Sequence, residues 1–297
     1  MSGLPKSESP RKHYDIYAIL EGSQELYFGA EKEVNINIVE KVRVWTPQGE
    51  MEKCYISPTK RRGVERRCLL WSDAGGQLLM DELDCGIPNT CCKDNCPICA
   101  VYGGMVAGSK TFIGRLTHSG GVAVAAQIAL EKQRAMHPAL IHKEGDTNPK
   151  QKEFSPMPFR KEYAQPGLLY PVSNHCISVT ENEFTAVAYA FLMSLNRVGA
   201  GNPKGVAFAR AVWNDLEGKT HQDEPLLVLD EYRVPLGDRP IISPTITHNS
   251  QAVETFIKLA KTCYEPATDD FKRFTGIDAH KRLQELALKF YQNHLKA

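Results

Sequence analysis

The sequence predicts an α+β fold with a ferredoxin-like core, and three observations lead to this class. The chain has 297 residues, of which 42% are apolar, enough for one large core with insertions. No run of about 18 apolar residues occurs, which argues against a membrane-spanning helix. Apart from one extra strand near the start and the tail, strand and helix patterns follow the order β, α, β–β, α, β. We therefore expect one domain over residues 1–297.

The first elements of this order lie before residue 80. Residues 34–45, VNINIVEKVRVW, have an apolar side chain at nearly every second position, as a strand does. The preceding YDIYAILEG, residues 14–22, predicts a neighbouring strand of the same sheet. A short helix is predicted to begin near Val64 in VERRCLLW, and the glycines of DAGG, residues 73–76, end it.

A hairpin and a polar excursion are predicted in the middle of the chain. Residues 111–118, TFIGRLTH, and 122–131, VAVAAQIALE, read as strands joined by the turn Ser119–Gly121. Residues 131–165 are polar, contain four prolines and show no steady period. This segment is expected to leave the body of the domain as an insertion.

The clearest helical pattern lies between two further strands. Apolar residues from Phe184 to Leu195 recur at the i, i+3, i+4, i+7 spacing of a buried stripe. Thr180 and Glu183 form a capping-box signature before it. The flanking strands and a pair of C-terminal helices are predicted over three ranges: 166–180, 205–213 and 249–297.

Five of the nine cysteines lie within residues 84–103, DCGIPNTCCKDNCPICAVYG. The first residues lack the apolar segment of a secretory leader, so we expect a cytoplasmic protein, in which clustered thiols indicate metal before disulfides. Cys96 and Cys99 form a knuckle, because thiolates three residues apart can bind one tetrahedral zinc ion. A polar loop of about twenty residues cannot bury a core, and a metal would hold it in place.

The predicted zinc ligands are four thiolates: Cys85, Cys92, Cys96 and Cys99. Cys91 is an alternative to Cys92, and His118 is an alternative to Cys85. A closed site of this kind is structural. A redox CxxC is the competing interpretation and requires a cysteine of lowered pKa at a helix N-terminus. Catalytic zinc is disfavoured, because no His-rich pair or His-Glu motif accompanies the cluster.

The charges are balanced overall and uneven locally. The chain has 36 basic and 35 acidic residues. Residues 58–67, PTKRRGVERR, carry five basic residues and one acidic residue, a net charge of +4. Residues 216–240 carry three basic and six acidic residues, a net charge of −3. Opposed patches of this kind favour a subunit that binds a polyanion on one side, and ordinary solvated faces are the alternative.

Four stretches, taken together and in order, resemble one family. They are SPTKRRGVERRCLL (57–70), CPICAVYGG (96–104), PGLLYPVSNHCISVT (166–180) and NRVGAGNPKGVAFARAVW (196–213). The set resembles the CRISPR-associated RAMP superfamily, in particular the backbone subunit of Cascade-type effector complexes. Type I-D is the most similar subtype, and type IV is the alternative.

The resemblance implies a non-catalytic subunit that binds CRISPR RNA through its phosphates, leaving the bases to pair with a complementary target. It also implies further copies of the chain and other complex subunits as partners, with no membrane, and a thumb-like hairpin at residues 131–165. The implied RNA contacts are Lys60, Arg61, Arg62, Arg66, Arg67, Arg197, Gly201, Lys204 and Arg210. Basic residues at a helix start and glycines near a phosphate provide contacts that do not depend on sequence.

Two other functions are compatible with the same sequence. The first keeps the fold and adds metal-dependent cleavage of target RNA, as in type III backbone subunits. Its aspartate would be one of Asp73, Asp81, Asp84 and Asp94, none of which can be matched to the family's residue. The second is a zinc-stabilised interaction module that binds no nucleic acid.

Overall fold

The computed structural model describes residues 10–28, 30–33, 36–126, 130–134, 159–200, 204–214, 220–234, 238–262 and 270–296. The helices are α1 (Pro58–Leu70), α2 (Leu79–Leu83), α3 (Pro97–Tyr102), α4 (Glu181–Ser194), α5 (Asn249–Ala260) and α6 (Gly276–Phe290), with a 3₁₀ turn at Leu195–Arg197 and a π turn at Tyr291–Leu295.

The strands are β1 (Lys12–Glu21), β2 (Ala30–Glu33), β3 (Ile36–Val39), β4 (Lys41–Thr46), β5 (Gly49–Ile56), β6 (Asp73–Ala74), β7 (Gln77–Leu78), β8 (Gly104–Val106), β9 (Lys110–Phe112), β10 (Leu116–His118), β11 (Gly121–Val122), β12 (Leu130–Arg134), β13 (Phe159–Tyr163), β14 (Leu169–Val179), β15 (Ala207–Phe208), β16 (Arg210–Asn214), β17 (Thr220–Pro225), β18 (Leu227–Tyr232) and β19 (Phe271–Thr275).

The central sheet is antiparallel and has the strand order β10-β14-β1-β18-β19, with β15 paired to the end of β1. Helix α1 lies between β1 and β10 in the chain, and α4 lies between β14 and β18. Numbered along the chain, the four core strands therefore have the spatial order 4-1-3-2 of a ferredoxin-like sheet. The α+β class predicted from the sequence is confirmed.

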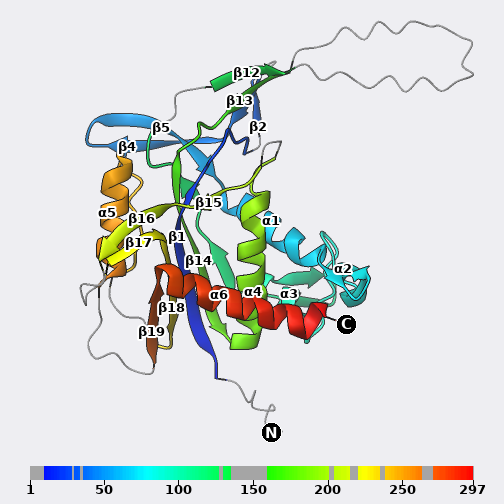
Figure 1. Ribbon diagram of the computed structural model, residues 1–297. Coiled ribbons are helices and arrows are strands. Elements are labelled where there is room, and N and C mark those ends of the chain that lie inside the picture. The colour runs from blue at the N-terminus through cyan, green and yellow to red at the C-terminus, as the bar shows by residue number, and fades with distance from the viewer. Residues whose placement is uncertain are drawn as a thin grey trace, which may run out of the picture.

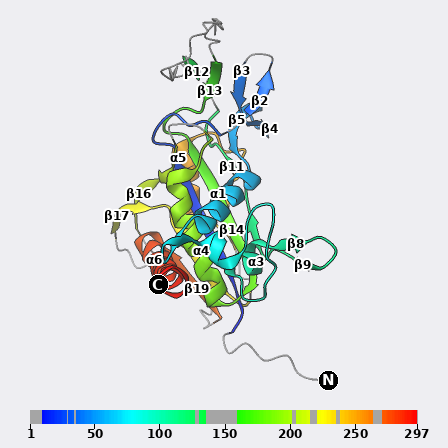
Figure 2. The same ribbon diagram turned by 90° about the vertical axis from the view of Figure 1, so that its right-hand side faces the viewer.

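Both faces of the central sheet are buried, and β1 shows how. Its side chains alternate, so that Ile16 and Leu20 join one core cluster while Tyr17 and Ile19 join another. Helix α4 packs against α1 and α6 over the first cluster, and α5 contributes Phe256 to the second (Figures 1 and 2). One helix layer thus covers each face.

Smaller sheets extend from this core. Strand β5 joins β4 and β11, and β13 joins β12 and β3, with β2 at the outer edge. Strands β8 and β9 form a hairpin that projects from the body (Figure 2). At the base of the excursion, β12 and β13 pair antiparallel. Most of the predicted thumb, residues 135–158, lies outside the described residues.

Strand β1 was expected to be an extra strand outside the core and is in fact the centre of the sheet. Strand β1 pairs with β14 and β18, and its residues Asp15–Leu20 are all buried. The pattern at residues 34–45 is divided at Glu40 into β3 and β4, which belong to two smaller sheets. The prediction that this segment pairs with β1 was wrong, because alternation of apolar residues shows one buried face and not which sheet buries it.

The predicted hairpin at residues 111–131 was also wrong. Strand β10 pairs with β14 and β11 pairs with β5, so the glycine turn connects two different sheets. A Cβ atom on Gly120 would lie 2.3 Å from the ring of Tyr55, so any larger residue here would have to displace that ring. Residues 123–126 belong to no strand, residues 127–129 lie outside the described residues, and Leu130–Arg134 form β12.

Two predicted helices agree with the structure to different degrees. Helix α4 follows its predicted range, and Thr180 and Glu183 make both hydrogen bonds of the capping box. Helix α1 begins at Pro58 instead of near Val64, because Ser57 is extended and proline is favoured in the first turn. In the part of the chain that the structure describes, no helix is both long and apolar enough to cross a membrane.

Replacing Thr180 with alanine is expected to destabilise the protein by about 1 kcal/mol, because the N-cap hydroxyl that accepts from the Glu183 N–H is lost. For a domain of this size, a loss of about 1 kcal/mol lowers the melting temperature by roughly 2 to 4 °C, measurable by circular dichroism. The exposed Thr111→Ala serves as control, and an equal shift in both variants would contradict a role for the cap.

Candidate nucleic-acid interface and metal centre

Helix α1 carries the largest group of predicted RNA contacts. Its Val64, Cys68 and Leu69 are buried, while Arg62 and Arg67 on the opposite side are exposed. Because residues three and four apart share a helix face, the basic run of this segment is distributed around the helix. The basic side chains of α1 therefore lie on different sides of the helix and contact different parts of the protein.

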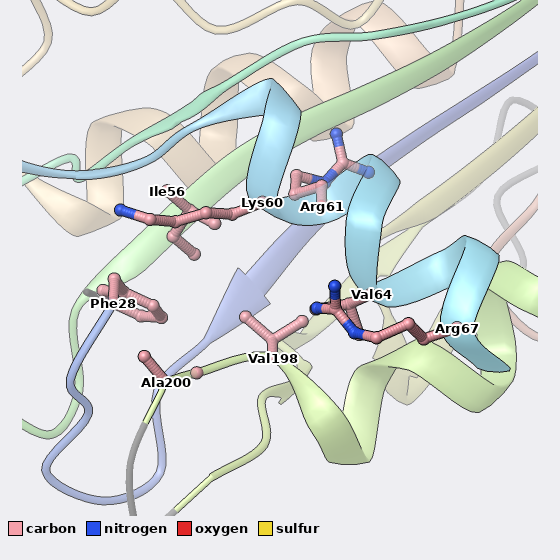
Figure 3. A pocket seen from close by; sticks show the side chains of 9 residues that line it. Phe28, Ile56, Lys60, Arg61, Val64, Arg67, Val198 and Ala200 are labelled. Carbon is pink, nitrogen blue, oxygen red and sulfur yellow. The ribbon is translucent and has the colours of Figure 1, made fainter. Parts of the chain in front are cut away.

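A pocket of about 130 Å³ lies beside the first half of α1, and we call it the α1 pocket. Phe28, Ile56 and Val198 provide apolar walls, with Lys60 and Arg67 on the helix side (Figure 3). The pocket closes against the backbone of residues 198–200, just beyond the 3₁₀ turn. Lys60 also forms an ion pair with Glu40, which leaves its ammonium half-exposed at the rim.

A larger hollow of about 540 Å³, the α1 groove, lies on the other side of the helix. Arg62, Arg66 and Arg67 line it, together with Thr59 of the same helix. Ile87 of the loop that follows α2, and Leu116, Thr117 and His118 of β10, form further parts of its wall. The residues lining the pocket and the groove include no acidic side chain.

Backbone carbonyls hold two of these arginines. Arg62 donates from Nη2 to the carbonyl of Tyr102, and Arg66 donates from Nη2 to the carbonyl of Gly86 at 3.4 Å. The Arg66 Nε atom is buried and has no hydrogen-bond partner among the described residues. A guanidinium has five donors, so one carbonyl contact orients the group and leaves donors for an anion.

Arg61 is directed into the protein. Its side chain is 4% exposed and its Nη1 atom donates to the carbonyls of Ser119 and Ser173 at 2.8 and 3.0 Å. The Nη2 atom donates to Asn174 Oδ1 at 2.5 Å and lies 3.9 Å from Glu65. Three of its five donors are used inside the protein, and the phosphate contact expected of Arg61 stays a prediction. Arg61 joins α1 to β14.

Glu65 completes this buried network. Its carboxylate lies 2.7 Å from His118 Nε2 and accepts from Tyr102 Oη and Asn174 Nδ2, each at 3.1 Å. Burial alone would raise the pKa of Glu65, but the charge and hydrogen bond of His118, together with Arg61, hold it below its usual value. His118 is committed to this carboxylate, so its predicted role as an alternative zinc ligand is not supported.

The remaining predicted RNA contacts are more dispersed. Arg197 and Lys204 are exposed at either end of the turn beyond α4, and Gly201 lies outside the described residues. Gly205 has φ of +102°, a conformation that favours glycine. Arg210 pairs with Asp223 at 3.3 Å and lines neither the α1 pocket nor the α1 groove.

Residues 84–103 form what we call the metal loop. The sulfur atoms of four cysteines lie within 4.8 Å of one another: Cys85, Cys91, Cys96 and Cys99. Cys96 is the N-cap of α3, so the knuckle spans the first turn of that helix. Four converging thiols on a buried turn suit a tetrahedral ion of the zinc type.

The cluster contains three members of the predicted ligand set, with the alternative Cys91 in place of Cys92. Cys92 is buried outside the cluster, with its Sγ 3.6 Å from Thr90 Oγ1 and facing Gly104. Its φ of +46° turns the chain, and of the adjacent pair it is Cys91 whose sulfur points to the other thiols. Spacing alone could not separate two adjacent cysteines, because the choice depends on the local backbone conformation.

The thiols are not equivalent. A hydrogen bond from Cys96 lowers the pKa of the Cys85 thiol. Burial raises the pKa of the Cys99 thiol to about 12. A bound divalent cation would displace the protons that remain, since metal ligands must be deprotonated.

The aspartates considered for metal-dependent cleavage do not converge. Asp73, Asp81, Asp84 and Asp94 are all exposed, and Asp94 forms an ion pair with Lys110 at 2.6 Å. Within the described ranges, the cysteine cluster is the only group of possible ligands close enough to share an ion.

One hydrogen-bonded array was missed by the sequence analysis. Ser173 Oγ lies 2.9 Å from His175 Nε2, and His175 Nδ1 lies 3.1 Å from Asp15 Oδ1. Tyr17 and Tyr232 donate to the same carboxylate at 2.8 and 3.0 Å. Ser173 is 7% exposed, so the array joins β1, β14 and β18 from inside. The alternate-residue spacing of Ser173 and His175 on a predicted strand was the available signal.

No family model and no curated protein matches the sequence. Among solved structures, the chain is similar to Csc2 of Thermofilum pendens, with 12% identity over 98% of this chain and 81% of that chain and a TM-score of 0.42. It is similar to a chain of a type IV-B CRISPR complex, with 14% identity, coverage of 78% and 96%, and a TM-score of 0.40. A chain of a CRISPR RNA-guided surveillance complex gives 15% identity, coverage of 88% and 87%, and a TM-score of 0.45.

Two of these three structures are described as CRISPR complexes. With identities of 12 to 15% and TM-scores of 0.40 to 0.45, these similarities assign no residue and no activity to it. Its function has to be argued from its own side chains.

Replacing Arg61 with methionine is expected to destabilise the protein by about 3 to 5 kcal/mol, because it removes one charge and three hydrogen bonds from the buried network around Glu65. Urea denaturation followed by tryptophan fluorescence measures the change. Arg43→Met is the control, since Arg43 is 73% exposed and surface changes of this kind usually cost less than about 0.5 kcal/mol. A similar midpoint for both variants would show that the network is not needed for stability.

Proposed function

We propose that the chain is a non-catalytic, RNA-binding subunit of a CRISPR effector complex. Several copies assemble along one CRISPR RNA, which pairs with a complementary strand. Each copy binds guide phosphates along α1, and Arg197 and Lys204 extend the contact beyond the α1 pocket. The excursion at residues 131–165 reaches the neighbouring copy. The proposal combines the motif resemblance with the chemistry of the two hollows.

The observation that carries this proposal is the arrangement of cations on α1. Lys60 and Arg67 face the α1 pocket, and Arg62, Arg66 and Arg67 face the α1 groove, with no acidic side chain lining either hollow. Arginine donors in a fixed geometry suit phosphate oxygens and do not distinguish bases. A cationic helix with a hollow on each side can therefore follow a sugar–phosphate backbone of any sequence.

We also propose that the cysteine cluster binds structural zinc. Cys85, Cys91, Cys96 and Cys99 would hold the ion, and zinc would supply a fixed cross-link between α3 and the part of the metal loop that precedes it. Three of the four thiols are buried, as expected of a closed site that admits no substrate.

Removing two arginines should weaken RNA binding in a salt-dependent way. For Arg62→Gln combined with Arg67→Gln, the slope of log K against log salt should become shallower by about 1.4, at roughly 0.7 per phosphate contact to a single strand. Fluorescence anisotropy with labelled single-stranded RNA at several salt concentrations measures the slope. The matched control is Lys258→Gln with Lys272→Gln, which removes two exposed cations on α5 and β19. Equal slopes for the two double variants would refute the proposed interface.

Zinc content should distinguish the two adjacent cysteines. Cys91→Ser is expected to weaken zinc binding by more than about tenfold, because one of four ligands is lost, whereas Cys92→Ser should retain one zinc ion per chain. Elemental analysis of the purified proteins, followed by competition with a chelating dye, measures both. Loss of zinc from the Cys92 variant alone would reverse the ligand assignment.

A further inference from the structure

We propose that the metal centre controls the strength of RNA binding, because it positions the two carbonyls that orient Arg62 and Arg66 in the α1 groove. The inference rests on the proposed function and adds a regulating element to the same interface. On this view zinc has a second effect besides stabilising its own loop. It fixes the orientation of the Arg62 and Arg66 side chains, which bind phosphate.

The first link is the carbonyl of Gly86. Gly86 directly follows the ligand Cys85, and its carbonyl accepts from Arg66 Nη2 at 3.4 Å. The next residue, Ile87, lines the α1 groove. A change in the position of Cys85 therefore moves both the carbonyl that orients Arg66 and part of the groove wall.

The second link is the carbonyl of Tyr102. Helix α3 begins after the ligand Cys96, contains the ligand Cys99 and ends at Tyr102, whose carbonyl accepts from Arg62 Nη2. The helix has six residues, too few to be stable by itself in water. Its position depends on the metal cross-link at its first turn and on the burial of its side chains.

The segment between α2 and α3 has little other support. Residues 84–96 contain no helix or strand, and the loop is stabilised by isolated hydrogen bonds, such as Gly86 N to the Asn89 carbonyl at 2.7 Å. Without a cation, the four sulfurs would be left within 4.8 Å of one another with nothing to link them. A bound metal would therefore add a constraint on the Gly86 carbonyl to those from the buried Cys85 side chain and from the hydrogen bond of Cys85 N to the Met80 carbonyl at 2.9 Å.

The consequence for RNA concerns the order of two arginine side chains. A side chain that is already oriented loses less conformational freedom when a phosphate binds, so its contact contributes more to affinity. Arg67 lines the same groove and has no hydrogen bond to the metal loop among the described contacts. Metal loss should therefore affect the contributions of Arg62 and Arg66 and leave that of Arg67 unchanged.

The test is a coupling experiment on the full chain with a labelled single-stranded RNA of mixed sequence. RNA affinity is measured by anisotropy before and after zinc is removed by a chelator under reducing conditions. Three proteins are compared: the native chain, Arg62→Gln with Arg66→Gln, and Arg67→Gln. Zinc removal should weaken binding about tenfold for the native chain and for Arg67→Gln, and less than about twofold for the double variant.

Equal weakening in all three proteins overturns the inference, because zinc would then act on the whole fold. No weakening of the native chain overturns it as well. Circular dichroism shows whether the stripped protein stays folded, and if it does not, Cys91→Ser, which keeps three thiols, replaces stripping in the same three backgrounds. A zinc-loaded native chain that binds no RNA even at low salt would refute the proposed function itself. RNA binding that is insensitive to zinc refutes only the coupling.

Discussion

The buried contact between Arg61 and Glu65 determines how α1 presents its charges. Beneath the helix, Arg61 donates hydrogen bonds to two backbone carbonyls and to Asn174. Glu65 forms hydrogen bonds with His118 and Asn174 in the same place. A buried pair of opposite charges is stable only when its hydrogen-bond donors and acceptors have partners. Both side chains find these partners in one orientation of α1, so the pair fixes how the helix is oriented. With that side of α1 directed inward, the remaining cations face solvent on its flanks.

The two hollows and the metal loop follow from this orientation. The α1 pocket lies against the turn beyond α4, and the α1 groove lies against the metal loop and β10. Each hollow therefore combines α1 with a segment distant in sequence. The groove depends most on the metal loop, because Gly86 and Tyr102, which accept from its arginines, belong to the same loop as the clustered cysteines.

Much of the fold could be predicted from local sequence patterns. The α+β class, helix α4 with its capping box, strand β14 and the clustering of thiols all depend on residues near one another in sequence. The pairing of the strands was harder to predict from the sequence. The segment at residues 34–45 and the glycine turn at Ser119–Gly121 were assigned to the wrong neighbours, since pairing depends on which surfaces meet after folding.

The sequence by itself determined that a basic helix, a four-thiol cluster and a ferredoxin-like order of elements occur in one chain. Only the tertiary structure decided that Arg61 is internal while Arg62, Arg66 and Arg67 face a hollow, and that Cys91 rather than Cys92 joins the cluster. Composition and spacing show which chemical groups are available. Their direction depends on burial and backbone conformation, which are properties of the packed molecule.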